Sequence, residues 1–261
     1  VAVNPISKNI YVSVSRGKSV GGIPVIVRID PSGKISDLPL DHAKYSSAAL
    51  PNPIASKSVR TRMEAITEIR YMNGRVLVAG LSNEEFSSNM RSVAFPFTSA
   101  DANGGASIEI YHGSHGEYET NAPVRTFLPY TIDNQPYILA AYTCTPLVKI
   151  PVSSLKAGNK VEGTTIAEMG AGNRPLDMIA YRKNGHDYIL MANSARGVTK
   201  LDAAHLDSYP AITFPTDITG VPYKRVDGWE GVKRLKKYGG AQALIMTEVG
   251  QEVDLRTMPL P

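Results

Sequence analysis

The stretch Arg174-Pro-Leu-Asp-Met-Ile-Ala-Tyr-Arg-Lys-Asn-Gly-His-Asp-Tyr-Ile-Leu-Met-Ala-Asn193 decides the fold, because it has the pattern of two β-strands joined by a tight turn. Apolar and aromatic residues lie on both sides of Asn184-Gly185, and an Asn-Gly pair between two such runs is a strong indicator of a β-hairpin. The second run leads into the polar segment 193–196. The stretch therefore predicts a hairpin with both ends at one polar edge.

The same pattern recurs along the chain. Comparable strand–turn–strand stretches span residues 65–80, 126–141 and 231–246, and the first of them again turns at Asn73-Gly74. The units repeat at about 45 to 50 residues with room for four strands each, and such a period is typical of β-propeller blades. The sequence therefore predicts an all-β propeller of four-stranded antiparallel blades.

Five blades can be assigned within a single domain over residues 1–261. Their approximate bounds are 1–40, 65–120, 124–169, 174–214 and 229–259. The segment 83–105 has no counterpart in the other units and is interpreted as an insertion that could serve as a lid or docking arm. The first unit begins with a short strand and the last ends after three. Because propellers close their ring of blades, we expect missing N-terminal residues, giving six or seven blades, or another chain to complete it.

Composition excludes several classes of protein. Hydrophobic residues make up 43% and charged residues 20%, which is the balance of a globular protein. The net charge of +4 is spread along the chain, and its densest basic cluster, residues 233–237, is interpreted as a solvated hairpin, so we expect no nucleic-acid partner. A single cysteine excludes an intrachain disulfide. No apolar run is long enough to span a membrane.

Propeller connectivity predicts which loops share a face. The loops between blades and those between the second and third strands emerge together at the channel mouth, where ligands usually bind. We expect a ligand- or partner-binding surface there, formed by Arg62, Glu64, Asn83, Thr143, Asn173, Arg174, Asp177, Asn193, Arg196, Trp229 and Glu248.

Two of these arginines occupy equivalent positions before an innermost strand. Arg62 and Arg174 could bind a carboxylate or phosphate group, because guanidinium offers a bidentate fork. Alternatively, each pairs with a nearby acidic residue such as Glu64 or Asp177 and links adjacent blades. The second interpretation is favoured.

The segment His112-Gly-Ser-His115 has spacing suited to a metal, and Glu109, Glu117 or Glu119 could add a carboxylate ligand. However, it aligns with an outer-strand turn that we expect on the face opposite the channel, where turn geometry explains its glycines. No metal site or cofactor is therefore predicted, and His112 and His115 stay as the only metal candidates.

Cys144 follows a predicted strand near the channel face. A catalytic thiol needs a histidine base, and no histidine can be placed beside it from the sequence. A packed, unreactive thiol is favoured. No nucleophile elbow, glycine-rich phosphate loop or zinc-protease helix is present, so no catalytic residues are predicted.

The segments Gly172-Asn-Arg-Pro-Leu-Asp-Met-Ile179 and Tyr188-Ile-Leu-Met-Ala-Asn193 give the chain a resemblance to bacterial β-propeller repeat proteins. It is similar to the propellers grouped with quinoprotein amine dehydrogenases and lactonase-like enzymes. The resemblance covers nearly the whole chain at the level of fold, and no metal or quinone ligands carry over. Because such propellers are commonly exported, it implies a periplasmic or secreted protein.

Two functions remain open. The favoured one is a non-catalytic binding propeller, an exported subunit or scaffold that binds a partner protein or small ligand at its channel face. The alternative is a metal- or cofactor-dependent propeller enzyme, a lactonase- or quinoprotein-like hydrolase or oxidoreductase. The first is favoured over an enzyme because the channel candidates are mostly Ser, Thr, Asn and Arg rather than metal ligands.

Overall fold

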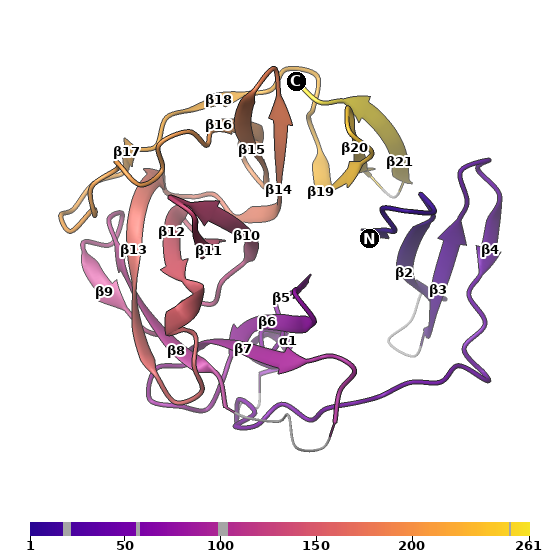
Figure 1. Cartoon of the computed structure of the whole chain (residues 1–261), viewed down its shortest axis with the longest axis horizontal. Helices are drawn as coiled ribbons and strands as arrows, with labels where there is room; N and C mark the ends of the chain where they lie inside the picture. The colour runs from indigo at the N-terminus through magenta and orange to yellow at the C-terminus, as the bar shows by residue number, and fades with distance from the viewer. Residues whose placement is uncertain (18–21, 56–57, 99–103, 251) are drawn as a thin grey trace. The chain divides into compact units, whose positions relative to one another are not determined.

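The structure is a computed structural model that describes residues 1–17, 22–55, 58–98, 104–250 and 252–261. It divides into two compact units, one formed by Val1–Tyr45 with Gly231–Pro261 and the other by Ser46–Glu230. Both are built from antiparallel meanders, the blades of a propeller (Figure 1). The predicted all-β propeller class is confirmed, whereas the single domain over 1–261 stays a prediction.

The larger unit contains three blades of four strands each. The first is β5 (Glu68–Met72), β6 (Arg75–Leu81), β7 (Ser88–Ala94) and β8 (Ala106–His112). The second is β10 (Thr126–Ile132), β11 (Gln135–Ala141), β12 (Pro146–Pro151) and β13 (Lys160–Met169). The third is β14 (Pro175–Lys183), β15 (His186–Asn193), β16 (Gly197–Asp202) and β18 (Tyr223–Arg225). Two short strands add to these sheets: β9 (Glu117–Glu119) pairs with β8, and β17 (Ile218–Gly220) pairs with β13.

Helical structure is short. The helix α1 spans Val59–Met63, and the 3₁₀ turn η2 spans Val152–Ser154. Among the described residues, no helix has the length and apolar character to cross a membrane.

The smaller unit contains a blade from each end of the sequence. One is β1 (Ala2–Val3), β2 (Ile10–Arg16), β3 (Ile23–Ile29) and β4 (Ile35–Asp37). The other is β19 (Val232–Tyr238), β20 (Gln242–Val249) and β21 (Glu252–Pro259). Within this unit β1 lies against β19.

The predicted hairpin turns are confirmed. Asn184 and Gly185 have φ values of 51° and 82°, and Lys183 pairs directly with His186 across this two-residue turn. Asn73 and Gly74 adopt the same left-handed conformation, with φ values of 49° and 75°. A two-residue turn with both φ values positive matches the right-handed twist of the flanking strands, and Asn and Gly tolerate it best.

The interpretation of 83–105 as an insertion is wrong for its first half. Ser88–Ala94 forms β7, which pairs along its whole length with β6, from Arg75 opposite Ala94 to Leu81 opposite Ser88. Its sequence conceals this strand, because the polar residues Asn89 and Arg91 are buried in place of apolar ones. Residues 99–103, the centre of the supposed lid or docking arm, lie outside the described residues.

The extra strand changes the face on which the next turn emerges. Because β7 is the third strand of its blade, β8 becomes the fourth, and β8 runs parallel to β13 of the neighbouring blade. In turn β13 is antiparallel to β12, and β12 to β11. The carboxyl ends of β8, β11 and β13 therefore point the same way. The predicted placement of the His112–His115 turn opposite the Cys144 loop is wrong.

Two apolar cores hold the three blades together. One fills the space between the first two blades and includes Leu77, Ile108, Phe127 and Ile138. The other lies between the second and third blades, where Leu139, Ile166, Met178 and Met191 are buried. Ile138 and Leu139 are successive residues of β11 that serve different cores, which is the alternation expected of a strand buried on both faces.

Candidate functional site

Several predicted channel residues meet in the structure through arginines. Arg125 Nη2 lies 2.8 Å from Glu64 Oε1, and Arg125 Nε donates a hydrogen bond of 2.9 Å to Thr143 Oγ1. The buried Asp177 accepts a bond of 2.7 Å from Arg70 Nη2. The first ion pair joins neighbouring blades, whereas Arg70 of β5 and Asp177 of β14 belong to the first and third blades. In these pairs Glu64 and Asp177 contact Arg125 and Arg70, not the Arg62 and Arg174 of the favoured linking interpretation.

A second predicted group lies on the loops around the third blade. Asn173 Nδ2 donates to Asn193 Oδ1 at 2.9 Å, and Asn193 Nδ2 donates to Thr199 Oγ1 at 3.1 Å. The backbone N–H of Arg174 donates to Ser194 Oγ, and Arg196 Nη2 donates to the carbonyl of Ala171 at 3.3 Å. These bonds fix the loop conformations.

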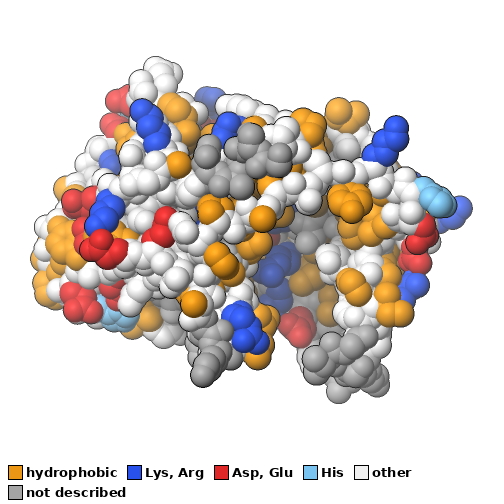
Figure 2. Space-filling model, turned by 90° about the horizontal axis from the view of Figure 1, so that it is seen from below, with side chains coloured by type: hydrophobic (Ala, Val, Ile, Leu, Met, Phe, Trp, Pro, Cys, Tyr) orange, Lys and Arg blue, Asp and Glu red, His pale blue; other side chains and the backbone are white. Residues whose placement is uncertain are grey.

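The remaining four predicted residues do not take part in the bonds of these groups described above. Arg62 lies in α1, where its backbone N–H donates to the carbonyl of Ser58. The backbone N–H of Asn83 donates to the carbonyl of Asn52, and Trp229 is buried. Glu248 belongs to β20 of the smaller unit. A binding role for the eleven channel residues stays a prediction. Figure 2 shows Lys and Arg interspersed with Asp and Glu on the face viewed there.

A separate polar group gathers at the carboxyl end of β8. His112 ends the strand, and the backbone N–H groups of His115 and Gly116 both donate to the carbonyl of His112, at 3.1 and 2.8 Å. This tight turn places the two imidazole rings 3.9 Å apart between centroids. Glu119, at the end of β9, contacts both rings: its Oε2 lies 3.0 Å from His112 Nδ1, and its Oε1 bonds to His115 Nδ1.

Cys144 joins this pair of histidines from the adjacent blade. It lies in the turn after β11 with a φ of 60°, and its backbone N–H donates to the carbonyl of Asn173 at 2.8 Å. One potential ligand atom from each of His112, His115 and Cys144 lies within 4.8 Å of the others. The expectation of a packed thiol without a neighbouring histidine is therefore corrected.

The two histidines differ in burial, and only His115 is half-exposed. The side chain of His112 is 2% exposed, and its Nε2 is buried without a hydrogen-bond partner among the described residues. Burial acts to raise the pKa of Glu119, but the hydrogen bonds and charges of His112 and His115 outweigh it, so the pKa is lowered overall. Glu119 is therefore a carboxylate that accepts from both Nδ1 atoms and leaves both Nε2 atoms for another partner.

Glu168 brings a second carboxyl group to the same turn. Its Oε1 accepts a bond of 2.6 Å from the backbone N–H of Gly113, and its Oε2 is buried without a partner among the described residues. Burial is the main reason that the pKa of Glu168 is raised to about 8. The hydrogen bond from Gly113 acts to lower this pKa, and the negative charges of Asp217 and Glu119 act to raise it further. Glu168 is therefore protonated at neutral pH.

Glycine is required at position 113 for this approach. A Cβ there would lie 2.9 Å from Glu168 Cγ and 2.9 Å from Thr216 Cγ2. Sequence reasoning grouped His112 and His115 with a neighbouring glutamate, Glu109, Glu117 or Glu119, but did not place Cys144 beside them. It missed Glu168 altogether, because nothing in the strand sequence distinguishes this glutamate.

Comparisons with known proteins assign no family. No family model matches the chain, and no curated protein matches it. A solved structure that does match is a glycoside hydrolase of family GH43, engineered to display both endo-xylanase and exo-arabinofuranosidase activity. The identity is 11% and the TM-score 0.39, over 98% of this chain and 49% of the hydrolase, so the chain spans about half the length of that protein.

These findings correct two expectations. The matched structure is an enzyme, so the comparisons give no support to the preference for a non-catalytic binding propeller. No comparison supports the resemblance to quinoprotein amine dehydrogenases and lactonase-like proteins beyond the propeller fold itself. A likeness this low transfers neither activity nor residues, so any enzymatic proposal depends on this chain's own geometry. Periplasmic or secreted localisation stays a prediction.

Proposed function

We propose that the chain is a metal-dependent hydrolase whose ion is bound by His112, His115 and Cys144. The observation that supports this is the convergence of three ligand atoms within 4.8 Å, with both imidazole Nδ1 atoms on the same carboxylate, Glu119. Histidine ligands of metals almost always donate their other ring N–H to a carboxylate or carbonyl, which fixes the tautomer and the ring orientation. A single carboxylate here serves two candidate ligands.

The donor set favours zinc. Imidazole nitrogen and thiolate sulfur are the usual ligands of Zn²⁺, and three protein ligands leave a fourth position for water or substrate, as in catalytic zinc sites. A zinc ion bound in this way supplies a Lewis acid and lowers the pKa of water. His112 Nε2 has no hydrogen-bond partner in the part of the chain that the structure describes, which supports this assignment because a buried imidazole nitrogen without a partner costs free energy.

Glu168 is suited to proton transfer beside this group. Its neutral carboxyl group contacts the His112–His115 turn through the hydrogen bond from the backbone N–H of Gly113. Its Oε2 has no hydrogen-bond partner among the described residues and can therefore bond to a substrate. A carboxyl group with a pKa near 8 can protonate a leaving group at neutral pH and take a proton back afterwards. We assign it the role of general acid.

The same side chains support a second candidate, a cysteine hydrolase. Cys144 has a left-handed backbone, φ 60°, in a tight turn, and such strained positions are common at active sites. A thiol beside a histidine that is oriented by a carboxylate such as Glu119 is a nucleophile–base–orienter arrangement. The zinc proposal is preferred, because this mechanism needs only one of the two histidines.

The test compares hydrolysis of p-nitrophenyl acetate by the chelator-treated protein before and after one equivalent of zinc. We expect activity only with zinc, and at least about a tenfold loss in His115→Gln, whose half-exposed side chain can be replaced without unfolding. His186→Gln, at the exposed start of β15, is the matched control and should retain activity. Hydrolysis that survives chelation but is lost in Cys144→Ser would reject zinc in favour of the cysteine mechanism. Absence of hydrolysis despite bound zinc would reject the reaction class.

A further inference from the structure

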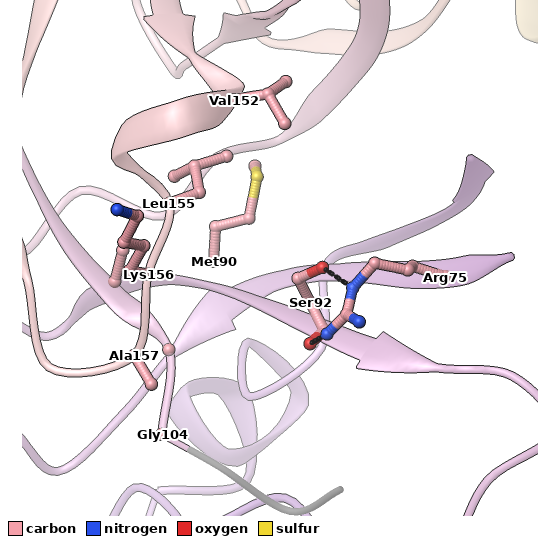
Figure 3. Close-up of a pocket in the computed structure, with 10 residues that line it drawn as sticks. Arg75, Met90, Ser92, Gly104, Val152, Leu155, Lys156 and Ala157 are labelled. Carbon is pink, nitrogen blue, oxygen red and sulfur yellow. Dashed lines mark hydrogen bonds between the residues drawn. The ribbon is translucent and has the colours of Figure 1, made fainter. Parts of the chain in front are cut away.

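A cavity of about 360 Å³ lies in the larger unit between β7 and the segment that follows β12. Figure 3 shows Met90 pointing toward Val152 and Leu155, so that these side chains form an apolar wall. Ala106, at the start of β8, adds to the apolar lining. A volume of this size, with apolar and polar groups in its wall, falls within the range of small-molecule sites.

The polar groups of the cavity are cationic. Arg75 Nε donates to Ser92 Oγ at 2.7 Å, and Arg75 Nη2 donates to the carbonyl of Ser92 at 2.6 Å, which holds the guanidinium in place (Figure 3). Both acceptors are uncharged, so the positive charge of Arg75 is not neutralised by these bonds. Lys156 lines the cavity as well, and no carboxylate is among its described lining residues.

Neither cation forms an ion pair with any residue that the structure describes. Two bonds to Ser92 leave three of the five guanidinium N–H groups of Arg75 for another acceptor. A fixed guanidinium with N–H groups to spare is well suited to a carboxylate.

We propose that this cavity binds a small amphiphilic anion, a carboxylate with a short aliphatic chain. Its carboxylate is bound by Arg75, and its chain packs on Met90, Val152 and Leu155. Lys156, on the other side of Met90 from Arg75, adds positive charge to the site (Figure 3). An uncharged or cationic ligand of the same shape lacks the electrostatic contribution and binds more weakly. This site shares no residue with the His112–His115–Cys144 group, so the proposal is independent of the hydrolase function.

Calorimetric titration with octanoate tests the proposal, with octyltrimethylammonium as the probe of opposite charge. We expect octanoate to bind and octyltrimethylammonium not to bind. Arg75→Gln should weaken octanoate binding by about tenfold or more, because hydrogen bonds to charged groups contribute this much. Arg182→Gln, which removes an exposed arginine from the β14–β15 hairpin, should leave the affinity unchanged.

Lys156→Gln keeps the test decisive if Arg75→Gln fails to fold. Lys156 is exposed and its ammonium group makes no bond with the described residues, so we expect this variant to fold normally and to bind octanoate several-fold more weakly. The proposal is overturned if octanoate fails to bind the wild-type chain at millimolar concentration. It is also overturned if octyltrimethylammonium binds equally well, or if folded Lys156→Gln and Arg75→Gln both bind octanoate as the wild type does.

Discussion

Replacing Glu119 by Gln should weaken zinc binding without removing any zinc ligand. The Glu119 carboxylate, whose side chain is 13% exposed, accepts from His112 Nδ1 at 3.0 Å and from His115 Nδ1. The amide of Gln has one oxygen acceptor, and its nitrogen can only donate, so one of the two imidazoles loses its acceptor and both lose the negative charge.

Loss of an outer carboxylate partner typically costs 10- to 100-fold in metal affinity. We expect the zinc dissociation constant of Glu119→Gln to rise by about this factor, which corresponds to roughly 1.4 to 2.7 kcal/mol. The assay is competition between the protein and a chromogenic zinc chelator at pH 7. Glu117→Gln is the matched control, because Glu117 is an exposed residue of the same short strand β9.

Equal zinc affinity for wild type and Glu119→Gln would refute the reasoning, since Glu119 would then have no role in orienting the ligands. Equal weakening in Glu117→Gln would also refute it, because the effect would reflect surface charge alone.

Three further predictions concern the surroundings of the site and the centre of the fold. The pKa of Glu168 is raised to about 8 in the folded chain, so this carboxyl group ionises at a lower pH in the unfolded chain than in the folded one. The free energy of unfolding should therefore fall by several kcal/mol as the pH rises from 4.5 to about 8. Urea unfolding should show this loss in the wild type and not in Glu168→Gln. Gly113→Ala should lower the free energy of unfolding by about 1 to 3 kcal/mol, because the added Cβ clashes with Glu168. Gly240→Ala, which has open space around it, should change the free energy of unfolding by no more than about 0.5 kcal/mol. Equal effects of the two substitutions would contradict the packing argument. Asp177→Asn should destabilise the chain by about 3 to 5 kcal/mol in thermal or urea unfolding, because it leaves Arg70 beside a buried neutral amide. A loss below about 1 kcal/mol would show that the Arg70–Asp177 ion pair does not stabilise the fold.

Hairpins were the part of the fold that local sequence could predict. Asn-Gly at 73–74 and at 184–185 specifies a turn by its own backbone preferences, independent of the rest of the chain. The strand β7 was missed because its identity depends on tertiary context. Asn89 and Arg91 are buried, and Asn89 bonds to Glu84 at 2.5 Å, which no alternation of apolar residues reveals.

That single missed strand also hid the site. Counting β8 as a third strand put His112 and His115 on the face opposite Cys144, whereas β8 as a fourth strand puts all three at one edge. Glu168 could not be found in this way. Its raised pKa arises from burial against a turn 55 residues earlier and from the charge of Asp217, and neither is encoded near it in sequence.

The most direct test of the zinc site is an anomalous difference map from crystals of the zinc-loaded protein, measured on both sides of the zinc absorption edge. The account predicts one strong peak within about 2.0 to 2.4 Å of a nitrogen of His112, a nitrogen of His115 and the sulfur of Cys144. A map without a peak among these three side chains, in a protein that holds one zinc per chain, would contradict it.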